Sequence, residues 1–345
     1  MTLPAVYQGL LAGLEDRLQR IERPPVITLT TDFGTHDGYT GTMKGVILAL
    51  LPDAQVVDIS HEIAPQQIHE GAFILYRAYR YFPASAVHVA VVDPGVGTQR
   101  RPIVLLTRHG TFVGPDNGIF TYVLRAEQAV SENPEIADRP AWVGGMWGVA
   151  PNWAGDEGRG GHKPDDSGDA VYATRSGELP RAYHLTNPDY WLPGVSTTFH
   201  GRDIFAPVAA HLASGAGPDR MGKPISLNSL IKLPVRAPRI YRTAQGVTVT
   251  GQVIYVDRFG DIITNLPQQL LAPLLESARS VPVIEVGDHR IAGLSASYAD
   301  VQEGQPVALI GSEKLLEIAV RNANAAQRMK VRIGDVVRII FVSGD

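Results

Sequence analysis

The sequence contains no cysteine among its 345 residues. This absence excludes disulfide bonds, thiolate catalysis and zinc sites with cysteine ligands, and it agrees with a reducing cytoplasm, where we expect the protein to be located. No uncharged apolar run reaches the roughly 20 residues that cross a bilayer, and the first residues lack a signal-peptide pattern. We therefore expect no membrane association.

An excess of basic charge is also missing. Lysine and arginine number 31 against 35 aspartate and glutamate residues, which gives a formal net charge of −4. A protein that binds nucleic acid as its main task needs a basic face, so this class is disfavoured. The 44% hydrophobic and 19% charged content is that of a folded chain, and the length predicts two domains.

Hydrophobic periodicity divides the chain into parts. Apolar residues at steps of three and four predict an amphipathic helix over 1–23, packed on a domain surface or on a neighbouring subunit. From 24 to 232 strands alternate with helices, which predicts a mostly parallel sheet covered on both faces. The predicted strands are 26–30, 55–59, 86–92, 103–106 and 111–113, and the predicted helices are 39–51, 67–81, 118–124 and 204–213.

Two further regions have a different composition. Residues 127–187 are rich in Gly, Pro, Asp and Trp without periodicity, which indicates a long insertion or lid. A Pro-containing linker over 233–239 precedes a smaller domain, 240–345, in which short β-rich runs with little helix predict an antiparallel, barrel-like fold. These runs are 247–256, 261–264, 281–286, 306–310, 315–320 and 335–342.

Unusual polar segments follow two of the predicted strands, where open parallel sheets bind ligands. In Thr31–Gly38, the Asp32 carboxylate can accept hydrogen bonds from both hydroxyls of a ribose, or it can cap the following helix. In Val91–Gly97 a proline and two glycines make a tight turn, across which Asp93 and Arg100 could converge; an ordinary structural turn explains the same pattern.

Other segments carry weaker signals. His200, before the 204–213 helix, is a candidate proton carrier or an ordinary polar residue, and Asp257–Asp261 is typical of a hairpin turn. The Gly-rich patterns of dinucleotide enzymes, Rossmann methyltransferases and phosphate-loop ATPases are missing, as is the Gly-x-Ser-x-Gly of serine hydrolases. The histidines lack ligand spacing, so no metal site is predicted.

Five motifs occur in a fixed order along the chain: Thr31–Gly34, Val91–Gly97, Gly114–Gly118, Phe199–Asp203 and Asp257–Gly260. Together they resemble the S-adenosylmethionine (SAM) hydroxide adenosyltransferase family, relatives of the bacterial fluorinase and chlorinase. The resemblance covers residues 26–125 and 195–342. It implies an α/β domain, a β-barrel-like domain and a homotrimer whose active sites lie between one subunit's amino-terminal domain and the next subunit's carboxy-terminal domain.

The resemblance also implies a reaction, in which SAM and water give adenosine and methionine without a metal or cofactor. The positions that match the catalytic set are Asp93, Arg100 and His200. Asp32 matches the carboxylate that binds the ribose diol, and Asp37, Asp257 and Ser312 match contacts to the methionine end. The remaining positions expected to bind substrate are Phe199, Gly201, Phe259, Asp261 and Asn322.

We hypothesise that Arg100, held by Asp93, orients a water for attack on C5′, while His200 accepts or relays its proton. The halogenating relatives have an aromatic residue where Asp93 stands, so the anionic Asp93, the apolar Val96 and Gly201 disfavour a halide. Two alternatives stay open: a halide-dependent adenosyltransferase, and a non-catalytic sensor that binds SAM or adenosine.

Overall fold

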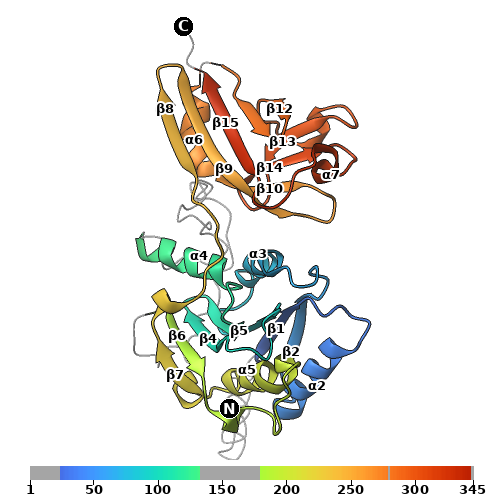
Figure 1. Ribbon diagram of the computed structural model, residues 1–345, viewed down its shortest axis with the longest axis vertical. Helices are drawn as coiled ribbons and strands as arrows, with labels where there is room; N and C mark the ends of the chain where they lie inside the picture. Colours follow the sequence, from blue (N-terminus) through green and yellow to red (C-terminus); the bar gives the residue numbers. More distant parts are fainter. Residues whose placement is uncertain (1–23, 133–178, 279, 343–345) are drawn as a thin grey trace, which may run out of the picture.

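The computed structural model describes residues 24–132, 179–278 and 280–342, which form the two domains seen in Figure 1. The helix predicted for 1–23 and most of the segment 127–187 lie outside the described residues. None of the described helices is long and apolar enough to cross a membrane.

The amino-terminal domain is built on a sheet with the strand order β2-β1-β3-β5-β4-β6-β7. Neighbours from β2 to β5 are parallel, whereas β4, β6 and β7 add antiparallel pairs at the other side. This confirms the predicted α/β fold with a mostly parallel sheet. The strands are β1 (Val26–Thr31), β2 (Gln55–Ser60), β3 (Val87–Val91), β4 (Pro102–Thr107), β5 (Gly110–Pro115), β6 (Arg181–Leu185) and β7 (Gly222–Ile225).

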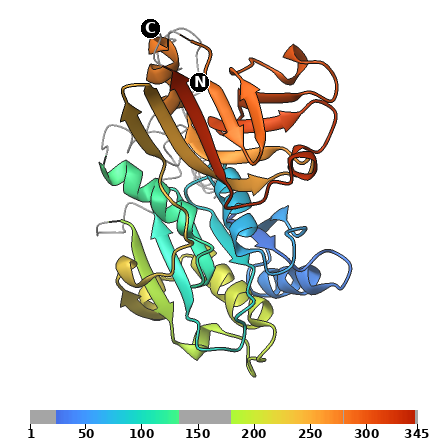
Figure 2. The ribbon, with the colours of Figure 1, turned by 45° about the horizontal axis from the view of Figure 1, so that its top comes forward.

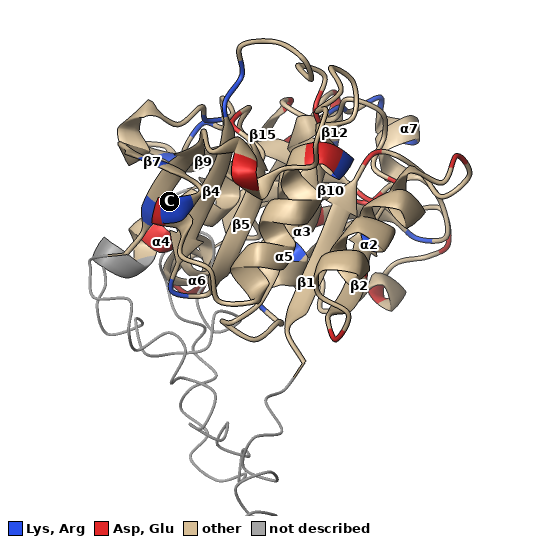
Figure 3. Cartoon of the chain, turned by 90° about the horizontal axis from the view of Figure 1, so that it is seen from below, with Lys and Arg blue, Asp and Glu red and all other residues tan. Residues whose placement is uncertain are grey.

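Helices cover both faces of this sheet, as continuous apolar strands require. One face carries α2 (Tyr39–Leu50) and α5 (Ala206–Ala213), and the other carries α3 (Ile68–Tyr79) and α4 (Thr121–Glu132). Every residue of β3 and β5 is buried. In Figure 3 the central strands are almost free of charged residues.

The prediction of an irregular segment over 127–187 extends too far at both ends. Helix α4 continues to Glu132, and β6 pairs with β4 and β7 inside the sheet. The predicted start of this helix at Gly118 is also early, because Gly118 has a left-handed φ of 101° and the helix begins at Thr121. Five-residue β6 escaped prediction because Pro- and Gly-rich sequence surrounds it and its pairing partners are far away in the chain.

The carboxy-terminal domain is an antiparallel sheet with the order β12-β11-β15-β9-β10-β14-β13, to which β8 adds beside β9. The two ends of this path meet where the Ser295 N–H donates to the Ala308 carbonyl at 2.8 Å, so the sheet is a nearly closed barrel (Figure 2), as predicted. The strands are β8 (Arg239–Thr243), β9 (Gly246–Val256), β10 (Ile262–Pro267), β11 (Val283–Val286), β12 (His289–Ala292), β13 (Pro306–Ile310), β14 (Leu315–Val320) and β15 (Val336–Val342).

Two helices in this domain were not predicted, α6 (Gln268–Ser277) and α7 (Ala325–Met329). In α6 the internal Pro273 interrupts the pattern by which a helix is recognised, yet Leu271 anchors the helix in the barrel core. Single turns of 3-10 helix occupy Pro188–Tyr190, Pro218–Arg220, Leu227–Ser229 and Tyr298–Asp300, and a π-helical turn occupies Gly201–Phe205.

The domains share a hydrophobic core. Tyr255 and Leu315 of the barrel belong to the same buried cluster as α3 and α4, and the Tyr255 ring lies 4.9 Å from that of Phe73. Polar contacts reinforce this junction, because Glu313 binds both Arg77 of α3 and Arg80, which directly follows that helix. Val235 of the connecting segment is itself buried against the first domain.

Candidate active site

The turn after β3 is closely packed against the segment before His200. Gly97 has a left-handed φ of 77°, and a Cβ atom there would lie 2.5 Å from the carbonyl oxygen of Thr197. Only glycine permits both the conformation and the approach. Two backbone hydrogen bonds within the turn, Val96 to Asp93 and Thr98 to Gly95, fix its shape.

This turn brings Asp93 and Arg100 together. Arg100 Nε donates to both oxygens of the Asp93 carboxylate, at 3.0 and 2.9 Å, and Nη2 makes a further contact to Oδ2. The two side chains are 4% and 8% exposed, so the ion pair is largely desolvated and each charge depends on the other. The Arg100 guanidinium also lies over the Phe205 ring.

His200 completes a three-residue chain, since Arg100 Nη2 lies 2.7 Å from His200 Nδ1. Arginine has only donors, so Nδ1 must accept, and the neutral ring carries its hydrogen on Nε2. Burial and the neighbouring Arg100 charge lower the pKa of His200, which keeps the ring neutral. His200 therefore offers a donor at Nε2. That His200 accepts or relays the proton of a water stays a prediction.

Aromatic rings lie beside this chain of contacts. The ring of Phe199 lies 5.7 Å from that of Phe33 and 5.1 Å from that of Tyr39. Gly201 is buried under them, and an added Cβ would lie 3.2 Å from Phe33 and 3.1 Å from the Met43 sulfur. The predicted substrate positions Phe199 and Gly201 thus form an apolar, tightly packed wall next to His200.

The carboxylates predicted to bind substrate in this domain differ in environment. Asp32 follows β1 and accepts a hydrogen bond from the Gln66 backbone N–H at 2.8 Å, so it caps no part of α2. Asp37 is exposed and contacts only the neighbouring His36 among the described side chains. The structure thus brings Asp32 to the strand end but holds Asp37 by no contact to the rest of the site.

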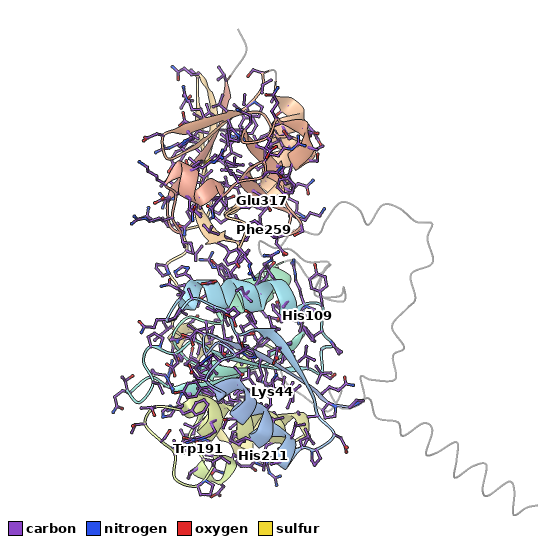
Figure 4. The ribbon with its side chains drawn as sticks, turned by 90° about the vertical axis from the view of Figure 1, so that its right-hand side faces the viewer. Lys44, His109, Trp191, His211, Phe259 and Glu317 are labelled. Carbon is purple, nitrogen blue, oxygen red and sulfur yellow. The ribbon has the colours of Figure 1, made fainter. Side chains whose placement is uncertain are left out.

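The carboxy-terminal candidates form a second group, at the end of the barrel that faces the first domain; Figure 4 labels Phe259 and Glu317 there. Asp257 accepts the N–H groups of Phe259 and Asp261, which is the hairpin-turn geometry that the sequence favoured. Phe259 is 76% exposed. Burial, with Asp257 and Glu317 nearby, raises the pKa of Asp261 to about 6.

A small pocket adjoins this turn. Asp257, Ser312 and Glu317 line it together with Arg77 of α3. Asn322 lies apart from the pocket-lining residues, exposed and left-handed with a φ of 57°. Its neighbour Arg321 donates to the Val301 carbonyl at 2.7 Å and so holds a barrel turn. Ser312 is thus grouped with Asp257, whereas Asn322 is not.

Within the described parts of the chain, no hydrogen bond or ion pair joins the group around Arg100 to the group around Asp257. The same parts contain no cluster of three or more histidine, aspartate and glutamate residues that could hold a metal ion.

The Gly114–Gly118 motif supports the candidate site through two of its side chains. Asn117 Nδ2 donates to the Val92 carbonyl, directly before Asp93, at 2.8 Å. Asp116 binds Arg101 and the Ile231 N–H, which fastens the interdomain segment to the sheet. The motif was therefore a usable signal for residues that support Asp93, although its partners could not be read from spacing.

Comparison with known proteins places the chain. The model of the SAM hydroxide adenosyltransferase N-terminal domain matches residues 27–144 and 164–222, and that of the C-terminal domain matches 251–338. The chain is 35% identical over 316 residues to an (R)-S-adenosyl-L-methionine hydrolase of Thermus thermophilus, covering 92% of this chain and 99% of that protein. A hydrolase of the same name from Salinispora tropica is 34% identical over 315 residues, with 91% and 97% covered.

More distant relatives and a solved structure agree. A fluorinase of Nocardia brasiliensis is 24% identical over 322 residues, with 92% and 97% covered. A crystal structure of an uncharacterized conserved protein from Thermotoga maritima superposes with a TM-score of 0.68 at 32% identity, covering 91% of this chain and 99% of that one. The chain belongs to the SAM hydroxide adenosyltransferase family.

Proposed function

We propose that the protein hydrolyses S-adenosyl-L-methionine to adenosine and L-methionine. The single observation that carries the proposal is the set of contacts that runs from the desolvated Asp93–Arg100 ion pair to His200. The similarity to proteins named as hydrolases of the (R) form, at 34–35% identity, supports this substrate and its sulfur configuration.

The reaction needs a positioned water more than it needs an acid. The sulfonium sulfur leaves as neutral methionine with the electron pair of the C5′–S bond, while the water oxygen forms a bond to C5′ and loses a proton to solvent. Arg100 Nη1 makes no hydrogen bond within the described residues, and His200 presents Nε2–H. Two donors of this kind orient a water and stabilise the hydroxide that forms from it.

Halide transfer is the second candidate, and the geometry argues against it. A halide in place of the water would sit close to the negative Asp93 carboxylate. The positive charge of Arg100 is already paired with that carboxylate. The fluorinase relatives are also less similar, at 24–25% identity. A sensor that binds SAM without turnover is the third candidate.

One incubation separates these candidates. Purified protein is mixed with (R)- or (S)-SAM, with and without chloride, and the products are identified by chromatography. Hydrolysis predicts adenosine and methionine from the (R) form with no chloride requirement. Chloride-dependent 5′-chloro-5′-deoxyadenosine would establish halide transfer instead, and calorimetric binding without adenosine release would establish a sensor. Dialysis against EDTA should leave turnover unchanged, because we propose no metal or cofactor.

The roles of Arg100 and His200 can be separated by variants. His200→Asn keeps an acceptor near the Nδ1 position for Arg100 but removes the Nε2 donor, so turnover should fall about 100-fold with substrate affinity retained. Arg100→Ala should lower turnover further, because it also leaves Asp93 buried without its partner. Single-turnover rates and calorimetric affinities test this. Full activity in both variants would contradict the assignment.

We also propose that the protein is a cytoplasmic homotrimer. In it, the group around Asp257 of one subunit lies against the group around Arg100 of the next subunit and completes the active site. The separation of the two groups within the described chain and the 76% exposure of Phe259 support this arrangement. Sedimentation analysis should give a mass near three chains. Mixing an Arg100→Ala subunit with an Asp257→Ala subunit should restore part of the activity, which a site within one chain would not do.

A further inference from the structure

The loop between β2 and α3 is fastened to the turn that carries Asp32. The His61 carbonyl accepts the Gly34 N–H at 2.8 Å, and His61 Nδ1 lies 2.8 Å from the Thr31 hydroxyl. A few residues on, the Gln66 N–H reaches the Asp32 carboxylate. One loop thus contacts the Thr31–Gly34 turn before, at and after Asp32.

The His61 side chain is part of a longer polar chain. Its Nε2 lies 3.0 Å from Asp58 Oδ1, an electrostatic contact more than a well-aligned hydrogen bond, and Lys44 donates to the other Asp58 oxygen at 2.5 Å. Burial raises the pKa of Asp58, but the polar and electrostatic interactions with Lys44 and His61 outweigh it and bring the pKa below its ordinary value. Asp58 is therefore the anionic end of the chain.

The direction of the hydrogen bonds follows from Thr31. Its Oγ1 accepts the Phe33 N–H at 3.3 Å, so its hydroxyl hydrogen can point to His61 Nδ1. The ring then carries its own hydrogen on Nε2, toward Asp58. Although carboxylate, imidazole and hydroxyl line up as in a nucleophilic triad, Thr31 is completely buried, so no substrate reaches its oxygen.

The part of the loop that reaches Asp32, residues 64–67, contains an unfavourable backbone conformation. Residues 64–67 form a turn closed by the Gln67 N–H to the Ala64 carbonyl, with Pro65 and then Gln66 at its centre. Gln66 has a left-handed φ of 66°, which favours glycine, and this conformation accompanies the N–H that Gln66 donates to Asp32. One carboxylate oxygen of Asp32 is thereby held, and Oδ1 has no hydrogen bond within the described residues.

We propose that His61 is a positioning residue that sets the Asp32 carboxylate for the vicinal diol of a ribose. This inference rests on the proposed function, because it takes Asp32 as a ligand-binding group. His61 touches no ligand itself. It acts by locking Thr31 and Gly34 on either side of Asp32, while the Gln66 amide fixes the rotation of the carboxylate.

Two isosteric variants separate this role from general structural support. The amide of Asn can replace Nδ1, so His61→Asn keeps the contact to Thr31 and loses Asp58. The amide of Gln can replace Nε2, so His61→Gln keeps Asp58 and loses Thr31. Calorimetry on the full-length protein measures binding of adenosine and of 2′,3′-dideoxyadenosine, which lacks the diol. Thermal unfolding checks that both variants are folded.

We expect His61→Gln to weaken adenosine binding about tenfold, the scale of one misplaced hydrogen-bonding group, with dideoxyadenosine binding unchanged. His61→Asn should bind both nucleosides as the wild type does. In an Asp32→Asn background the effect of His61→Gln should disappear. An equal loss for both nucleosides, or a loss that persists without Asp32, would overturn the proposal.

The outcome is independent of catalysis. A wild-type protein that binds adenosine but releases none from SAM refutes the proposed hydrolysis, while the nucleoside comparison still decides the role of His61. A wild-type protein that binds the two nucleosides equally shows that Asp32 does not recognise the diol, and this refutes the positioning role even where hydrolysis is observed.

Discussion

At the residue scale, local spacing and long-range contact differ in how far they can be predicted. Asp93 and Arg100 flank one glycine-containing turn, so their convergence follows from seven residues of sequence, and the structure joins them. His200 lies 100 residues further on and meets Arg100 only because the sheet order places two segments together. Its place was predictable from the family resemblance alone, and the catalytic roles of all three stay predictions.

Asp261 gives a prediction on pH and stability. Its pKa rises on folding from the ordinary 3.8 to about 6, so the folded state prefers the protonated acid and loses stability as pH increases through this window. Asp261→Asn removes the loss. Because the site is half-exposed, we expect the variant to be more stable by only about 1 kcal/mol above pH 6 and equal near pH 4. Urea unfolding at several pH values measures this.

Asp300 is a control of opposite sign. Backbone N–H groups of Ser297 and Ala296 lower its pKa, so its stabilising effect is present at neutral pH and declines as pH falls. Asp300→Asn should therefore destabilise the protein at pH 8 and approach the wild type in acid. If both variants shift stability in the same direction at pH 8, the electrostatic explanation is wrong.

At the element scale, strands and helices with a clear period were predictable, and those defined by their partners were not. β3 and β5 are continuous apolar runs. β6 is a strand because β4 and β7 pair with it on either side, and α6 contains a proline that sequence analysis treats as a helix breaker. Tertiary pairing and packing outweigh local propensity in both cases.

The turn between β3 and β4 allows a matched glycine test. Gly97 and Gly38 have nearly the same φ, 77° and 75°, but an added Cβ meets the Thr197 carbonyl at Gly97 and nothing within 4 Å at Gly38. Gly38→Ala should cost about 1 kcal/mol of stability, the price of a left-handed alanine. Gly97→Ala should cost roughly 3 kcal/mol and should also lower turnover, because the turn must move away from His200.

Unfolding free energies and steady-state rates measure both variants. Equal destabilisation would mean that the turn relaxes away from Thr197 without strain. Unchanged turnover in Gly97→Ala would mean that the spacing between the Asp93 turn and the His200 segment does not matter for the reaction.

At the scale of the whole molecule, the contact between domains was not predictable. Glu313 binds Arg77 and Arg80 from a position more than 230 residues later in the chain, and no sequence pattern connects them. Arg80 and Glu313 are 6% and 11% exposed, so neither charge is well hydrated alone. Hydrophobic periodicity gives the cores of the two domains but says nothing of which surfaces they share.

Breaking this contact should be costly. Glu313→Gln leaves Arg80 buried without a counter-charge, and we expect a loss of about 3 kcal/mol in unfolding free energy. The matched control is Glu285→Gln, which breaks a pair with Arg290 whose side chain is 72% exposed and should change stability by less than about 0.5 kcal/mol. Guanidinium unfolding of both variants tests this; similar small losses would show that Arg80 finds another partner.

The core shared through Tyr255 and Leu315 has a consequence for synthesis. Chains emerge from the ribosome amino-terminus first, and α3 with Phe73 is made long before the barrel strands that cover it. The apolar face of α3 therefore stays exposed to solvent until β14 has been synthesised. A truncated chain ending near residue 232 should bind chaperones and aggregate, although it contains every strand of its own sheet.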